Sequence, residues 1–173
     1  MNARVGIAAI GALLAVVLQV ILAPNMMIID TMPSFIITYS LVIAMLLQGT
    51  PSYVIVFCLG LAGDLLGYGP VGALSFILLL CAFLIEKAVD FFGNGTVFVT
   101  GVILVAFVFV VHFLHAGFMV AISSSYTAID AFMLVAVPES LYDSVLAVLF
   151  YFLLRRILSP GQATMANIGP LSR

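Results

Sequence analysis

Long apolar runs, separated by short polar or helix-breaking segments, occupy most of the chain. A helix needs about 20 apolar residues to cross the hydrocarbon core of a bilayer, and fewer where neighbouring protein shields it. The pattern predicts six membrane spans, at residues 5–23, 34–48, 52–66, 71–85, 96–122 and 138–154. Breaks rich in Pro, Gly and Asn separate them, including a tight turn at 49–51 between the second and third spans.

Two parts of the pattern are not simple spans. Residues 129–137 are apolar but too short to cross, so they form either an interfacial or re-entrant helix or the outer extension of a kinked sixth helix. Pro138 permits both, since proline is tolerated in a first helical turn and kinks a helix interior. Residues 159–173 are rich in Gly, Pro and small side chains, which predicts a short disordered tail after a single membrane domain at 1–158.

Composition supports this interpretation and excludes other classes. Of the 173 residues, 65% are hydrophobic and 7% are charged, whereas about a quarter of a soluble domain is charged. A net charge of -2 with five basic residues leaves no basic surface for nucleic acid. The sequence therefore predicts an all-α polytopic membrane protein, with six transmembrane helices in a compact bundle.

The basic residues predict the orientation. Six spans place both termini on one side, together with every basic residue: Arg4, Lys87, Arg155, Arg156 and Arg173. The opposite loops carry only acidic charges, at Asp30, Asp64 and Asp130. By the positive-inside rule, both termini and the tail are cytoplasmic.

Asp64 is the strongest polar signal, because it lies one turn before a cluster of helix breakers at 67–70. An ionised side chain deep in a bilayer costs several kcal/mol by the lower estimates (~2.5–3.5). One interpretation is that Asp64 caps or pairs with another group in a groove. The other is that it lies at headgroup level and is hydrated.

Two further pairs of polar side chains share helix faces. Glu139 and Asp143 are four residues apart at the start of the sixth span, where carboxylates suit the positive helix terminus. We favour capping and packing for them over proton or cation handling. His112 and His115 lie in the outer half of the fifth span, and we favour interhelical hydrogen bonding over a metal site for them.

The first span carries small residues at helical spacing: Ala8, Gly11, Ala12 and Ala15. Such a face lets another helix approach closely, whether from this chain, a partner or a second copy in a homodimer. No catalytic, cofactor-binding or metal-binding motif is present in the sequence. We therefore predict a protein that is not an enzyme and that uses no cofactor.

Two segments resemble the family of the rod shape-determining protein MreD. One is Gly60-x-x-Gly63-Asp64-Leu-Leu-Gly67-x-x-Pro70-x-Gly72, and the other is Pro138-x-Ser-Leu-Tyr142-Asp143-x-Val-Leu-Ala-x-Leu-x-Tyr151-x-x-Leu-Arg155-Arg156. With the order of the spans, the resemblance extends to about residue 158. Asp143 departs from the family pattern, in which a neutral amide is expected, so no partner-binding role is carried over to it.

The resemblance implies a multi-pass subunit of the bacterial inner membrane that belongs to the cell-elongation machinery. It implies the bitopic protein MreC as partner, and beyond it RodA, a class B penicillin-binding protein and MreB, which direct lateral peptidoglycan synthesis. We expect a scaffold whose candidate interface residues are Ala8, Ala12, Asp64, Gly67, Pro70, Gly72, Pro138, Tyr142, Asp143, Arg155 and Arg156. The alternative is the substrate-binding subunit of an energy-coupling factor vitamin transporter, which is similarly small and has six spans.

Overall fold

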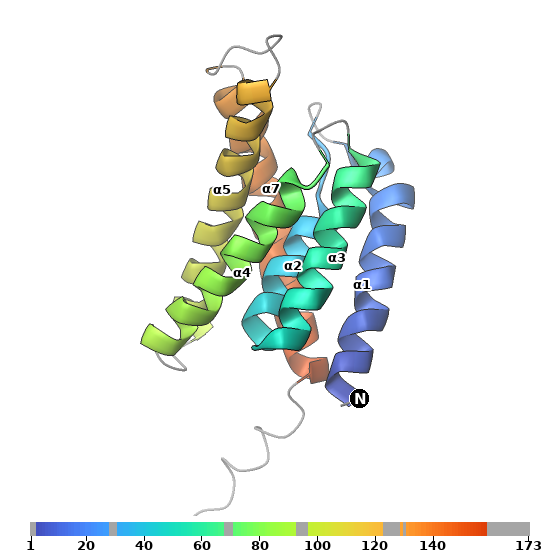
Figure 1. The fold of residues 1–173 in the computed structure, drawn as a ribbon, viewed down its shortest axis with the longest axis vertical. Coiled ribbons are helices and arrows are strands. Elements are labelled where there is room, and N and C mark those ends of the chain that lie inside the picture. Colours follow the sequence, from blue (N-terminus) through green and yellow to red (C-terminus); the bar gives the residue numbers. More distant parts are fainter. Residues whose placement is uncertain are drawn as a thin grey trace, which may run out of the picture.

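The computed structural model describes residues 3–27, 31–67, 71–92, 97–122, 129 and 131–158. Six α-helices are present within these ranges (Figure 1): α1 (Ala3–Ile21), α2 (Phe35–Leu46), α3 (Thr50–Leu66), α4 (Ala73–Phe92), α5 (Val97–Ile122) and α7 (Val137–Leu158). A 3-10 turn, η1 (Ala23–Met26), follows α1, and a π-helical segment, η2 (Ala131–Ala136), precedes α7.

Three of the helical segments are long and apolar enough to cross a membrane: Ala3–Ile21, Phe98–Ile122 and Ala131–Leu158. Two shorter apolar helices, Phe35–Leu46 and Thr50–Leu66, accompany them. The all-helical fold and its apolar helices agree with the sequence prediction. The tail at 159–173 and the residues Asp30, Pro70 and Asp130 lie outside the described ranges.

The short helix α2 forms the centre of the bundle (Figure 1). It packs against α1, α3, α4, α5 and α7, and its residues from Phe35 to Met45 are all buried. At about 1.5 Å per residue, α2 is only ~18 Å long, well below the ~30 Å of a hydrocarbon core. Neighbouring helices surround α2, so its length does not have to match the bilayer thickness. This is the shielding by neighbouring protein that its short apolar run predicted.

Two predicted boundaries are wrong. The fourth helix does not end at Ile85 but continues to Phe92, because Glu86 has partners there: its Oε2 accepts from the hydroxyl of Tyr53 and from the backbone N–H of Gly49 (3.3 Å). The third helix begins at Thr50, so only Gly49, with φ 89°, remains of the predicted turn at 49–51. Proline fits the first turn of a helix, where its missing N–H would be unpaired in any case.

The segment before α7 is an extension of the last helix. Residues Ala131–Ala136 are π-helical and run directly into Val137–Leu158, so Ala131–Leu158 forms one continuous apolar helix. Of the two alternatives for residues 129–137, the described part supports the outward extension.

The small-residue face of α1 packs against its own bundle. Ala8 and Ala15 are buried, Ala12 is half-buried, and the hydroxyl of Tyr39 in α2 donates to the carbonyl of Ala8 (2.8 Å). A Cβ on Gly11 would lie 2.2 Å from the Tyr39 hydroxyl oxygen, so glycine is required for this approach. The opposite face of α1 is apolar and exposed.

Candidate functional site

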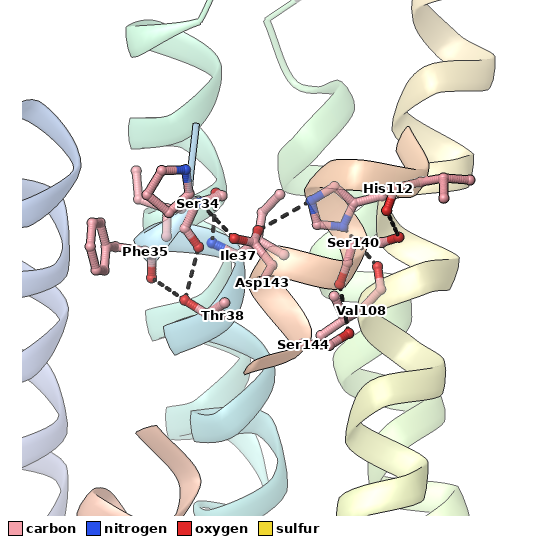
Figure 2. Close-up of polar contacts among 12 residues, drawn as sticks. Ser34, Phe35, Ile37, Thr38, Val108, His112, Ser140, Asp143 and Ser144 are labelled. Atoms are coloured by element: carbon pink, nitrogen blue, oxygen red, sulfur yellow. Dashed lines mark hydrogen bonds and ion pairs between the residues drawn. The ribbon is translucent and has the colours of Figure 1, made fainter. Parts of the chain in front are cut away.

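The carboxylate of Asp143 joins three helices inside the bundle (Figure 2). It projects from α7 and is fully buried. Its Oδ1 accepts from the backbone N–H of Ser34 at the start of α2 (2.8 Å), and its Oδ2 lies 3.2 Å from Nε2 of His112 in α5. The interhelical role favoured for His112 is therefore observed, and its partner is a carboxylate.

The hydrogen bonds of His112 determine how many protons the pair holds. Its Nδ1 lies 2.9 Å from the carbonyl oxygen of Val108, which can only accept, so Nδ1 carries a hydrogen. Nε2 faces the Asp143 carboxyl group, so a second proton lies on Nε2 or on Oδ2. Both arrangements give a pair with no net charge, which limits the cost of burying it in an apolar bundle.

Hydroxyl groups around this pair are satisfied locally. Ser34 caps α2 by accepting from the N–H of Ile37 (3.3 Å), and Thr38 donates to the carbonyl of Ser34 (2.8 Å). On α7, Ser140 donates to Val137 and Ser144 donates to Ser140, each to a carbonyl of the preceding turn. These hydroxyl bonds lie within α2 or α7, so the contacts between helices are those of Asp143 with Ser34 and with His112 (Figure 2).

Asp64 forms a second buried centre and caps α4 from the end of α3. Its Oδ2 accepts from the N–H of Gly72 (2.9 Å) and from both the N–H (3.1 Å) and the hydroxyl (2.6 Å) of Ser75. Its Oδ1 accepts from the N–H of Leu74 (2.9 Å). Gly72 has φ 102°, a conformation that L side chains rarely adopt, and this turn directs the first N–H groups of α4 at Asp64.

This arrangement decides between the two interpretations of Asp64. The side chain is 5% exposed and all four of its partners are donors within the chain, so the hydrated interpretation is wrong and the capping one is confirmed. A carboxylate beside a helix N-terminus is stabilised by the unpaired N–H groups there. Close packing accompanies the cap, because a Cβ on Gly60 would lie 2.5 Å from the Cα of Ser75.

The remaining candidate residues have different positions. Tyr142 donates to the carbonyl of Met26 (3.3 Å), which ties α7 to η1, and Pro138 is half-buried in the first turn of α7. Gly67 ends α3, and its N–H donates to Gly63. Arg155 and Arg156 are exposed in the last turn of α7. Pro70 lies outside the described residues.

Burial divides the eleven candidates. Ala8, Asp64 and Asp143 are buried by this chain's own helices, so in this structure they act on any partner only through the packing of the bundle. Sequence reasoning missed Ser34, Ser75, Tyr39 and Glu86. Ser34 could have been found, since serine before an apolar run is a typical N-cap. For Ser75, Tyr39 and Glu86 no local pattern in the sequence indicates their distant partners.

The described residues contain no group of three or more His, Cys, Asp or Glu side chains arranged to hold a metal ion. His112 is paired with Asp143, whereas His115, half-buried in α5, makes no hydrogen bond or ion pair within the described residues, so the interhelical role expected for it is not observed there. Both carboxylate centres are closed by protein donors. Their chemistry is that of helix fastening inside an apolar bundle, and the fold and site define a polytopic helical membrane protein.

Comparison with protein families identifies the kind of membrane protein. The chain belongs to the MreD family: the model described as rod shape-determining protein MreD matches residues 3–159. Proteins of this family are non-enzymatic membrane proteins of cell-shape determination. Neither the curated proteins nor the solved structures gave a match. The family assignment favours a role in rod-shape determination over the vitamin-transporter alternative.

Proposed function

We propose that this protein is a non-catalytic scaffold of the bacterial cell-elongation machinery, located in the inner membrane and docking the single transmembrane helix of an MreC-like partner. The observation that carries the proposal is the family match over nearly all of the helical bundle. Through that partner the chain would connect to RodA, a class B penicillin-binding protein and MreB, and so help to direct lateral peptidoglycan synthesis.

The proposed topology has six transmembrane helices and cytoplasmic termini. Support comes from the charges: α1 begins, α4 ends and α7 ends at the same end of the bundle (Figure 1), and these helix ends carry Arg4, Lys87, Arg155 and Arg156. Basic residues flanking membrane helices remain on the cytoplasmic side. In this orientation Asp64, Ser34 and Asp143 lie in the half of the bundle nearer the periplasm.

For the docking surface we propose the outer face of α1. This helix lies at the edge of the bundle (Figure 1) and packs against α2, α3 and η1, and its apolar window is the least buried of the three long candidate spans. Ile10 and Leu13 on this face are 70% and 71% exposed. In lipid, helices associate through packing and interhelical hydrogen bonds, so a helix covered on one side only offers the largest unused packing surface.

Site-specific photo-crosslinking in living cells tests both parts of the proposal. We expect a cross-linker at Ile10 or Leu13 to capture a bitopic component of the elongation machinery. Leu149 of α7 is 60% exposed on another helix and serves as the matched control, with no such product. Capture of that component from position 149 alone would move the interface, and capture of a second copy from position 13 would indicate a homodimer. Normal rod shape after depletion of the protein would contradict the function itself.

A further inference from the structure

A lateral groove runs between α5 and α7 at the end of the bundle where α5 begins and α7 ends. Its volume is ≈ 490 Å³, and it is lined on α7 by Val148, Tyr151 and Phe152 and on α5 by Phe98, Gly101, Val102, Leu104, Val105 and Ala106. All side chains there are apolar except for the Tyr151 hydroxyl. Phe98 and Phe152 are 76% and 55% exposed, so the groove opens sideways, toward the surrounding membrane.

The dimensions of the groove match one leaflet. At about 1.5 Å per residue, the wall from Phe98 to Ala106 is ~12 Å long, close to half of a ~30 Å hydrocarbon core. Gly101 lines the groove without a side chain, and the space that a Cβ there would occupy is open, with no atom within 4 Å. A spanning helix of a partner would extend well beyond such a groove, whereas one acyl chain of a lipid fits within it.

Arg155, a cation with no carboxylate partner among the described residues, lies beside the groove. The guanidinium carbon of Arg155 lies 5.9 Å from the centre of the Tyr151 ring, and that ring lines the groove. Among the described residues the one ion pair joins His112 and Asp143, so Arg155 has no carboxylate within 4 Å there. Its neighbour Arg156 is also exposed and unpaired in the same ranges, but makes no ring contact.

We propose that this groove binds one anionic glycerophospholipid, with an acyl chain between α5 and α7 and the phosphate on Arg155. The charge of Arg155 complements the headgroup, and guanidinium groups form paired hydrogen bonds with phosphate oxygens. Basic pockets between transmembrane helices are a known way to select such headgroups. The bound lipid would cover the apolar walls of the groove at the start of α5 and the end of α7.

Native mass spectrometry of the purified full chain tests the headgroup. We expect phosphatidylglycerol to be retained with a stoichiometry of one and phosphatidylcholine with the same acyl chains to be retained at least tenfold less. Arg155→Gln should weaken phosphatidylglycerol binding about tenfold, equivalent to ~1.4 kcal/mol. Arg156→Gln removes the same charge one residue away and should have little effect. Equal losses in the two variants, or equal retention of the two lipids, would overturn the proposal.

A second pair of variants tests the groove. Gly101→Leu fills it and should abolish retention of the lipid. Gly117→Leu, on the same helix and with equally open space at Cβ, lies outside the groove and should bind normally. If Gly101→Leu instead binds lipid normally and loses a protein partner in cells, the groove is a helix-docking site and the lipid proposal is wrong. The binding measurements need no partner, so their failure leaves the scaffold function untouched.

Discussion

The two buried aspartates should respond in opposite ways to the same conservative substitution. Asn has the shape of Asp but replaces one acceptor oxygen with an amino group that can only donate. At Asp143 the two oxygens face one backbone donor and one imidazole nitrogen, whereas at Asp64 they face four donors. We therefore expect Asp143→Asn to be tolerated and Asp64→Asn to be destabilising.

At position 143 the amide can keep both contacts. Its oxygen accepts from the N–H of Ser34, and its amino group donates to Nε2 of a neutral His112, whose Nδ1 still donates to Val108. One amide hydrogen is left unused beside an amino group that still donates once, so we expect a loss of about 1 kcal/mol, the low end for an unpaired buried donor. Asp143→Ala instead leaves the Ser34 N–H and His112 Nε2 unpaired, which should cost about 3 kcal/mol or more.

At position 64 no orientation of the amide is satisfactory. If its oxygen keeps the contacts of Oδ2 with Gly72 and Ser75, the amino group points at the N–H of Leu74. Two donors then face each other in a buried site, and each unpaired donor costs ~1–3 kcal/mol. The loss of an N-cap alone is ~0.5–2 kcal/mol. We expect Asp64→Asn to cost at least about 2 kcal/mol.

Equilibrium unfolding in mild detergent, followed by far-UV circular dichroism and repeated by steric trapping in bilayers, measures the order of the variants. The expected ranking of stability is wild type close to Asp143→Asn, then Asp64→Asn, then Asp143→Ala at or below it. If Asp143→Asn proved as costly as Asp143→Ala, the pair would require its charge, and hydrogen bonding to a neutral His112 would be the wrong account. A harmless Asp64→Asn would refute the capping role.

Three further outcomes follow from the packing and the charges. Gly60→Ala should destabilise the α3–α4 contact by ~1–3 kcal/mol, because the new Cβ would clash with the backbone of Ser75. Gly117→Ala has open space at Cβ and should be neutral or stabilise the protein by up to ~1 kcal/mol. Thermal unfolding compares the two variants. Tyr53→Phe should cost about 1 kcal/mol of unfolding free energy, because it removes the hydroxyl that donates to Glu86. The remaining donor to Glu86 is the Gly49 N–H. If that contact alone is sufficient, Tyr53→Phe will be neutral while Glu86→Gln still destabilises the protein. A single cysteine at Asp90 should be protected from impermeant thiol reagents in intact cells, and labelling from outside would overturn the cytoplasmic orientation.

Much of this architecture is local and could be predicted from the sequence. Whether a run is apolar enough for lipid depends on its own residues, so each of the six predicted runs coincides with a helix among the described residues, including the short central run at 34–48. Helix ends were less predictable. Glu86 marked the end of an apolar run but not of a helix, because its partners lie more than 30 residues earlier in the sequence: Tyr53 in the first turn of α3, and Gly49 just before that helix.

The sequence by itself determined that this is a membrane protein, because its apolar runs are long and its charges are few. Only the tertiary structure decided what the buried polar groups do. Asp143 and Ser34 are 109 residues apart, and Asp64 finds its donors in the next helix. A carboxylate in an apolar bundle must be paired, but its spacing along one helix does not say by which group. That choice depends on how α2, α5 and α7 pack, and no local pattern encodes it.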